Sequence, residues 1–224
     1  MPDALFCVPD PRAVSDLATF TSRAERLDAE GMIRVQGFAG GVACFVAPLY
    51  PAGLDDATPT VLGVRTVRAV VDQGLDVVLP LAEFREVVAA AGGSDEGRFV
   101  LPGEARTAVW TAISPPRANW RSMGHVPVTV LRAALSEGIR EVTTSAGSGD
   151  GDAHAGGPIV HRVRAAVWGR KLPEAAGVPA GCAWALDGLG FFDAETSVPV
   201  WRSGPWFRLA ASFGDVLARF RPGQ

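Results

Sequence analysis

The sequence predicts an α+β protein with mainly antiparallel sheet and about four helices. Apolar residues recur at helical spacing in three long segments. Elsewhere, short apolar runs rich in valine flank tight turns that contain glycine. The chain has 224 residues, of which 48% are apolar, so it can bury a core either as two related lobes or as one compact domain.

The long helices have recognisable starts. Asp10 can accept hydrogen bonds from a first turn and Pro11 suits the first helical position, so a helix is predicted from residue 11, with Gly31 at its end. A second helix is predicted after Pro80 and a third after Pro127. Each predicted helix has an apolar stripe along one face. The stripe is Val14, Leu17, Phe20, Ala24 and Leu27 in the first helix, Leu81, Phe84, Val88 and Ala91 in the second, and Val128, Leu131, Leu135, Ile139 and Val142 in the third.

The predicted strands are joined mainly by tight turns. Hairpins are predicted from 32–38 with 42–48 and from 61–71 with 75–79, and a strand pair from 98–101 with 106–113. The prediction continues with a strand over 159–169 and a short helix from Pro179. It ends with a strand and a hairpin, with Gly214 and Asp215 in the turn of the hairpin.

The chain is predicted to divide into an N-terminal lobe, 1–97, and a C-terminal lobe, 98–224. Residues 1–97 have 7 arginines against 14 acidic residues, whereas 98–224 have 14 basic residues against 10 acidic. Residues 145–158 are nearly all small or acidic, which is typical of a mobile surface loop because such a segment buries little apolar area.

Composition narrows the class of protein. Twenty of the 21 basic residues are arginine and Lys171 is the only lysine, a bias that we attribute to codons rich in G and C. With a pI near 5.6 and no clustered basic run, no nucleic-acid partner is predicted. Three well-separated cysteines, the absence of a signal peptide and the absence of an 18-residue apolar stretch predict a cytoplasmic protein with no membrane contact.

A short internal repeat is the most specific feature: "RTAVW" at 106–110 matches "RAAVW" at 164–168. If both are strands, Arg106 and Trp110 lie on one face, as do Arg164 and Trp168. Such pairs can form a shelf for an anionic or aromatic molecule through cation–π attraction. The alternative is that the tryptophans are core residues and the arginines extend to the rim.

A proline-stiffened segment, "PPRANWR" at 115–121, provides a second candidate site. Arg117, Asn119 and Arg121 lie close in sequence to His125 and could hold an anionic substrate beside a proton-transferring imidazole, with Trp120 as a further candidate binding residue. The alternative is a stiff connection in which the prolines fix the backbone and Trp120 anchors the loop.

No common catalytic motif is present. The sequence contains no GxxxxGK[ST], GxSxG or HExxH pattern and no CxxC pair, and no strand-associated GxGxxG. Asp150, Asp152 and His154 alternate as in metal-binding loops, but the later bidentate glutamate is missing. We therefore predict no metal site and no cofactor.

The segments "AISPPRANWRSMGHVP", "AVWG" and "WRSGPWFRLAASFGDVLAR" resemble a group of proteins from high-GC Gram-positive bacteria. The resemblance extends over most of the chain and is weakest over the first hundred residues. It implies a cytoplasmic bacterial origin and assigns no functional residues.

Two functions are favoured by these observations, and a third, nucleic-acid binding through the arginine-rich second half of the chain, ranks below them. The first is a binding or interaction protein without catalysis that uses an Arg/Trp surface to hold a small anionic or aromatic molecule, a protein partner or a second copy of the chain. The alternative is an enzyme that acts on a small anionic substrate with Arg117, Arg121 and His125 at its site.

Overall fold

The computed structural model describes residues 4–53, 56–72, 74–94, 96–103, 106–147, 156–192 and 196–220. Within them it has five α-helices and antiparallel strand pairs, which confirms the predicted α+β class. The chain forms two compact units. The first unit comprises Met1–Pro48, Leu62–Ser114 and Gly188–Gly190, and the second comprises Leu49–Val61, Pro115–Asp187 and Phe191–Gln224.

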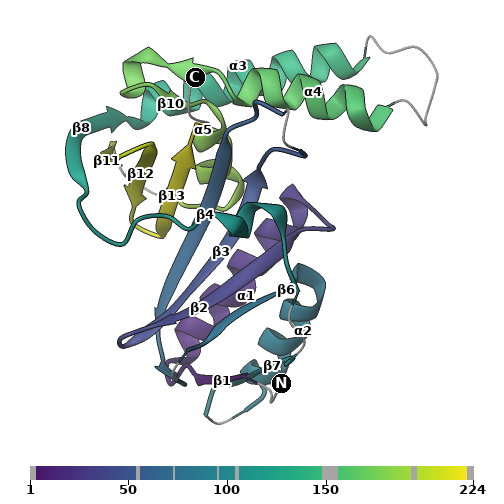
Figure 1. Cartoon of the computed structure of the whole chain (residues 1–224), viewed down its shortest axis with the longest axis vertical. Coiled ribbons are helices and arrows are strands. Elements are labelled where there is room, and N and C mark those ends of the chain that lie inside the picture. Colours follow the sequence, from purple (N-terminus) through teal and green to yellow (C-terminus); the bar gives the residue numbers. More distant parts are fainter. Residues whose placement is uncertain are drawn as a thin grey trace. The chain divides into compact units, whose positions relative to one another are not determined.

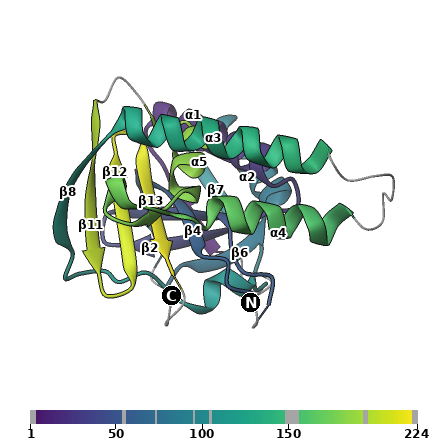
Figure 2. The ribbon, with the colours of Figure 1, turned by 90° about the horizontal axis from the view of Figure 1, so that it is seen from above.

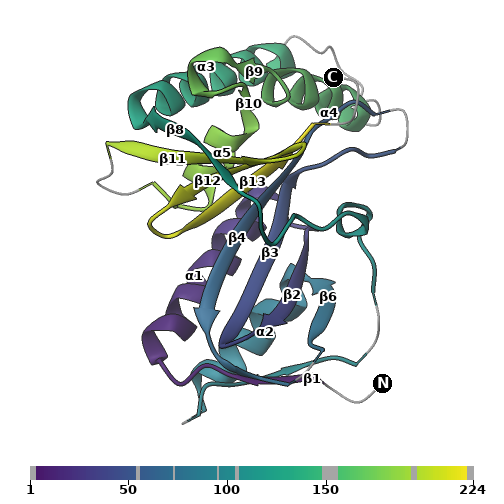
Figure 3. The ribbon, with the colours of Figure 1, turned by 60° about the vertical axis from the view of Figure 1, so that its left-hand side comes forward.

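The first unit combines a sheet with two helices. Strands follow one another in the order β6 (Asp76–Pro80), β2 (Met32–Phe38), β3 (Gly41–Leu49) and β4 (Thr60–Arg68). A second small sheet has the order β5 (Val70–Val71), β1 (Ala4–Cys7) and β7 (Arg98–Leu101). Helices α1 (Pro11–Leu27) and α2 (Leu81–Gly92) contact each other and lie on the same side of the strands β2, β3 and β4 (Figure 3).

The helices of the first unit form as the sequence predicts. Asp10 caps α1, since its Oδ1 accepts a hydrogen bond of 2.9 Å from the backbone N–H of Arg12. The predicted stripe of α1 is buried except for Leu27, which is half-buried, and the whole predicted stripe of α2 is buried. At the base of the unit Phe99 stacks on Phe6, with ring centroids 4.3 Å apart (Figure 1 shows β1 and β7 there). The periodicity therefore identified the core-facing sides of both helices.

The second unit has a sheet with the order β13 (Gly214–Arg219), β12 (Trp206–Ala211), β11 (Ser197–Ser203) and β8 (Arg121–Pro127), visible side by side in Figure 2. Helices α3 (Val128–Gly147) and α4 (Gly156–Trp168) pack along each other, and α5 (Gly181–Gly188) completes the helical layer. The short strands β9 (Lys171–Leu172) and β10 (Val178–Pro179) pair between α4 and α5.

Several local predictions are wrong. Segments 61–71 and 75–79 do not form a hairpin, because β6 pairs with β2 and β5 pairs with β1. Residues 106–113 contain the 3-10 helix Val109–Ala112 instead of a strand, and 159–169 lie mostly in α4. Strand β8 arises in a segment that was interpreted as a loop.

The division of the chain also differs from the predicted lobes. The first unit includes residues 98–114, beyond the predicted boundary at 97, because β7 pairs with β1. Within the predicted loop 145–158, residues 145–147 belong to α3 and 156–158 to α4, while 148–155, with Asp150, Asp152 and His154, lie outside the described residues. No helix in the described part of the chain is long and apolar enough to cross a membrane.

Candidate functional site

The first predicted Arg/Trp pair is separated by its partners. Arg106 forms an ion pair of 2.8 Å with Glu83 of α2. Trp110 lies on the 3-10 helix and is buried, with 6% of its surface exposed. A shelf that displays both side chains does not exist here, so this prediction is wrong.

The second pair stays together, but on a helix. Arg164 and Trp168 are four residues apart on α4 and both contact Trp184 of α5. The Arg164 guanidinium lies 4.7 Å from the centroid of the Trp184 ring. The Trp168 ring stacks on the Trp184 ring, with the two centroids 5.6 Å apart and an angle of 12° between the ring planes. Trp168 is buried. The cluster is therefore part of the core of the second unit, and Trp184 is the contact that the sequence did not reveal.

Residues 115–120 form a loop without regular secondary structure, and residues 121–125 lie in strand β8. The indole N–H of Trp120 donates a hydrogen bond of 3.2 Å to the carbonyl oxygen of Pro116, which closes the loop before β8 begins. Arg117, Arg121 and His125 are exposed. His125 lies on β8 opposite Pro199 of β11 and adjoins no carboxylate in the described contacts. Nothing here forms an enclosed site for proton transfer.

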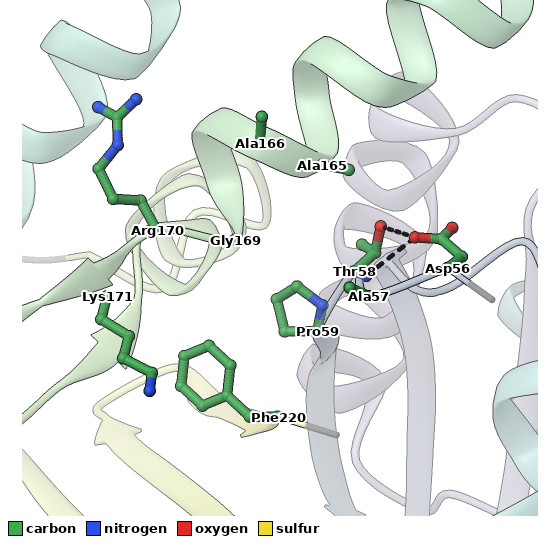
Figure 4. A pocket seen from close by; sticks show the side chains of 10 residues that line it. All are labelled: Asp56, Ala57, Thr58, Pro59, Ala165, Ala166, Gly169, Arg170, Lys171 and Phe220. Atoms are coloured by element: carbon green, nitrogen blue, oxygen red, sulfur yellow. Dashed lines mark hydrogen bonds between the residues drawn. The ribbon is translucent and has the colours of Figure 1, made fainter. Parts of the chain in front are cut away.

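A pocket of about 380 Å³ lies within the second unit, around the start of β9 (Figure 4). Its lining residues are Asp56, Ala57, Thr58, Pro59, Ala165, Ala166, Gly169, Arg170, Lys171 and Phe220. None of them was predicted as a site residue, although Lys171 was recognisable as the only lysine of the chain. The lining comes from three segments that are far apart in the sequence, and the spacing of apolar residues within one segment cannot predict that they meet.

Most polar groups of the pocket already have partners within the chain. Asp56 accepts hydrogen bonds from the backbone N–H of Ala52 and from both donors of Thr58. One terminal nitrogen of Arg170 lies 2.9 and 3.1 Å from the two oxygens of Glu141, and this hydrogen bonding raises the pKa of Arg170. Figure 4 shows Arg170 extending away from Lys171.

Lys171 is the cation that remains available at the pocket. Its ammonium nitrogen is 5.0 Å from the centroid of the Phe220 ring, which holds it by a cation–π contact without neutralising it. Pro59, Ala165 and the Phe220 ring supply apolar surface beside it. The pocket can therefore accept a ligand with an apolar part and an anionic group. No cluster of His, Cys, Asp and Glu suited to a metal ion occurs among the described residues.

Family models match both parts of the chain. Residues 1–112 match Domain of unknown function (DUF8010), and residues 115–223 match Domain of unknown function (DUF8185). The first match covers half of the chain, and the chain belongs to the DUF8010 family. No curated protein matches it.

The fold is similar to that of DNA polymerase beta subunits. The chain aligns over 99% of its length with a putative DNA polymerase III beta subunit from Eubacterium rectale, with a TM-score of 0.52 and 12% identity. The beta subunit from the DNA polymerase of Streptococcus pyogenes and subunit beta from Borrelia burgdorferi align over 98% and 100%, each with a TM-score of 0.50 and 9% identity. The chain spans 65% of the length of each of these three proteins.

These comparisons correct the predicted function and partners. Proteins of this fold, named as DNA polymerase subunits, contradict the prediction of an enzyme for a small anionic substrate and the exclusion of nucleic acid. The Arg/Trp surface also fails on geometry, because Trp110 and Trp168 are buried. The pI reflects the net charge of the whole chain and does not describe the charge of any one surface, so a low pI could not exclude a nucleic-acid partner.

Proposed function

We propose that this protein associates with DNA and with a protein partner, in the manner of a DNA polymerase III beta subunit. One observation carries the proposal: nearly the whole chain aligns with a DNA polymerase III beta subunit at a TM-score of 0.52. At 12% identity this similarity establishes the fold, and the function is our inference from it. Together with the sequence resemblance, this role supports the proposal that the protein acts in the cytoplasm of a bacterial cell.

The pocket beside Lys171 is our candidate for the protein contact. Its apolar lining and single available ammonium favour a short peptide segment that carries an aliphatic side chain next to a carboxylate. Arg170 is held by Glu141 and Asp56 is satisfied by its own loop, so Lys171 determines the charge preference.

Association with DNA is tested by fluorescence anisotropy of a labelled duplex titrated with the full chain. We expect binding that weakens steeply as salt rises from about 50 to about 200 mM, because counterions are released from the phosphates. Absence of binding both to this duplex and to a single strand of the same length, at the low end of this range, contradicts the proposal. A titration with a labelled bovine-albumin peptide mixture serves as the control for nonspecific adhesion.

The protein contact is tested with a labelled pentapeptide that carries one aspartate between two leucines. Binding is expected to fall on the order of tenfold when the aspartate is replaced by asparagine or when Lys171→Gln removes the ammonium. The matched variant Lys171→Arg keeps the charge and is expected to retain most of the affinity. Equal binding of the aspartate and asparagine peptides contradicts this assignment of Lys171.

A further inference from the structure

Three exposed arginines gather at one end of the sheet of the second unit. Arg121 of β8 and Arg202 of β11 are direct cross-strand partners. The hydroxyl of Ser203 donates a hydrogen bond of 3.3 Å to the carbonyl oxygen of Ala118, which brings the loop that carries Arg117 to the same end of β11. All three arginines are exposed.

The pairing of Arg121 with Arg202 is unfavourable for folding alone. Side chains directly opposite each other in an antiparallel pair lie close together, and like charges in these positions destabilise the sheet. Neither residue has an ion pair in the described part of the chain. The segments 105–136 and 196–214 contain no aspartate or glutamate. The two positive charges are therefore left for an anion from outside the second unit.

The side chain of Arg202 is held in place by contacts that leave its charge free. Arg202 donates through Nε to the carbonyl oxygen of Gly204 at 3.2 Å, and its guanidinium lies 5.3 Å from the Phe207 ring centroid. The loop before β8 is closed by the hydrogen bond from Trp120 to Pro116. Guanidinium groups positioned in this way lose little entropy when they bind phosphate oxygens.

We propose that Arg117, Arg121 and Arg202 form a phosphate-binding cluster that holds the sugar–phosphate backbone of a DNA strand. The inference rests on the proposed association with DNA and assigns one surface to it. Arginine pairs well with phosphate through its planar donors. The half-exposed Trp120 ring lies between Arg117 and Arg121 in sequence and offers a stacking surface to an unpaired base. A single strand is therefore expected to bind more tightly than a duplex.

The test compares the wild-type chain with Arg121→Gln/Arg202→Gln and with a control that loses the same charge. Arg68→Gln/Arg98→Gln removes two exposed arginines of the first unit. Anisotropy is measured with a labelled oligothymidine of about 20 nucleotides and with a duplex of the same length. The cluster variant is expected to bind roughly tenfold more weakly and to lose about one unit of salt slope for each phosphate contact. The control is expected to behave like the wild type.

A stability measurement separates loss of binding from loss of folding. Because the variant removes a like-charge pair, its thermal midpoint in the absence of DNA is expected to equal or exceed that of the wild type. A lower thermal midpoint with unchanged DNA binding contradicts the claim that the pair of Arg121 and Arg202 destabilises the fold and serves to bind DNA.

The remaining outcomes of the binding experiment separate an error in the cluster assignment from an error in the proposed function. If the wild type binds DNA and the cluster variant binds with the same affinity and slope, the cluster assignment is wrong and the proposed function stands. If the wild type binds neither DNA, the proposed function itself fails. If a poly-glutamate peptide displaces the strand as well as unlabelled oligothymidine does, the cluster recognises acidic protein segments and a DNA ligand is wrong.

Discussion

The two units use their arginines differently. In the first unit arginines pair with carboxylates: Arg34 with Asp76 and Arg65 with Asp16 at 2.6 Å each, Arg106 with Glu83 at 2.8 Å, and Arg85 with Glu25 at 3.3 Å. In the second unit Arg140, Arg170 and Arg208 also pair with carboxylates. Four cations among its described residues lie over aromatic rings instead, namely Arg132 over Phe192, Arg164 over Trp184, Lys171 over Phe220 and Arg202 over Phe207.

Composition explains the difference. The sequence of the first unit has 13 acidic residues against 9 basic, whereas that of the second has 11 acidic against 12 basic. Five of the six tryptophans belong to the second unit. A ring attracts a cation without cancelling its charge, whereas a carboxylate cancels it. Cations that remain able to bind an anion are therefore concentrated in the second unit.

The largest expected effect concerns the aromatic scaffold beneath these cations. Trp168→Ala removes a buried ring that stacks on Trp184, and is expected to lower the free energy of unfolding by about 3–5 kcal/mol. Trp110→Ala, in the first unit, is the matched control because its ring is buried to a similar extent without such a stack. Chemical denaturation is expected to show a loss smaller by about 1 kcal/mol for Trp110→Ala; equal losses contradict the special role of stacking in the second unit.

Alkaline pH tests the two units separately, because each has one buried thiol, Cys44 in the first and Cys182 in the second. Burial raises the pKa of Cys44 to about 12 and also raises the pKa of Cys182. The unfolded thiol loses its proton near pH 9 while the folded one keeps it. Stability is therefore complete below that pH and falls by about 1.4 kcal/mol per pH unit per thiol above it.

Cys44→Ala and Cys182→Ala are each expected to remove the part of the alkaline loss of stability that the replaced thiol causes. The free energy of unfolding is measured by urea titration from about pH 8, below the pKa of the unfolded thiol, to about pH 11, below the raised pKa of the folded thiols. A decline in Cys44→Ala as steep as in the wild type rules out the thiol as its source.

The ion pairs give a smaller effect. Asp76→Ala leaves Arg34, whose side chain is only 15% exposed, without the carboxylate that raises its pKa by hydrogen bonding. A loss of about 1–2 kcal/mol is expected, less than for a fully buried pair because Asp76 is 39% exposed. In the second unit Glu137→Ala breaks an exposed contact with Arg140 and is expected to cost less than about 0.5 kcal/mol. Urea titrations of both variants check this order.

A small effect is also expected from the loss of a single cation–π contact. Arg164→Gln removes the guanidinium over Trp184 and is expected to cost about 0.5–1 kcal/mol. Arg164→Lys keeps the charge and is expected to recover part of that loss in thermal melts. A melt of Arg164→Gln that matches the wild type shows that the contact contributes only packing.

The sequence predicted elements that depend on neighbours along the chain. The Asp10 cap, the helices after Pro11 and Pro80, and the hairpin around Gly40 all appear. It failed where partners are distant in sequence, as for β6, which pairs with β2 rather than with its neighbour.

The candidate sites failed for a related reason. Residues four apart, such as Arg164 and Trp168, share a face in a strand and in a helix alike, so spacing could not distinguish the two. The pocket beside Lys171 is built from three separate segments, and the cross-strand meeting of Arg121 with Arg202 depends on the register of β8. Of the three arginines in the proposed cluster, Arg117 and Arg121 stood out in the sequence, within "PPRANWR", where they were predicted to hold an anionic substrate.

Hydrogen–deuterium exchange of the full chain with and without oligothymidine tests most directly whether the second unit provides the DNA-binding surface. We predict slower exchange on DNA binding in peptides that cover 116–127 and 197–208, with unchanged exchange in β1, β5 and β7 of the first unit. Protection confined to the first unit, with no change along β8 and β11, would contradict the account.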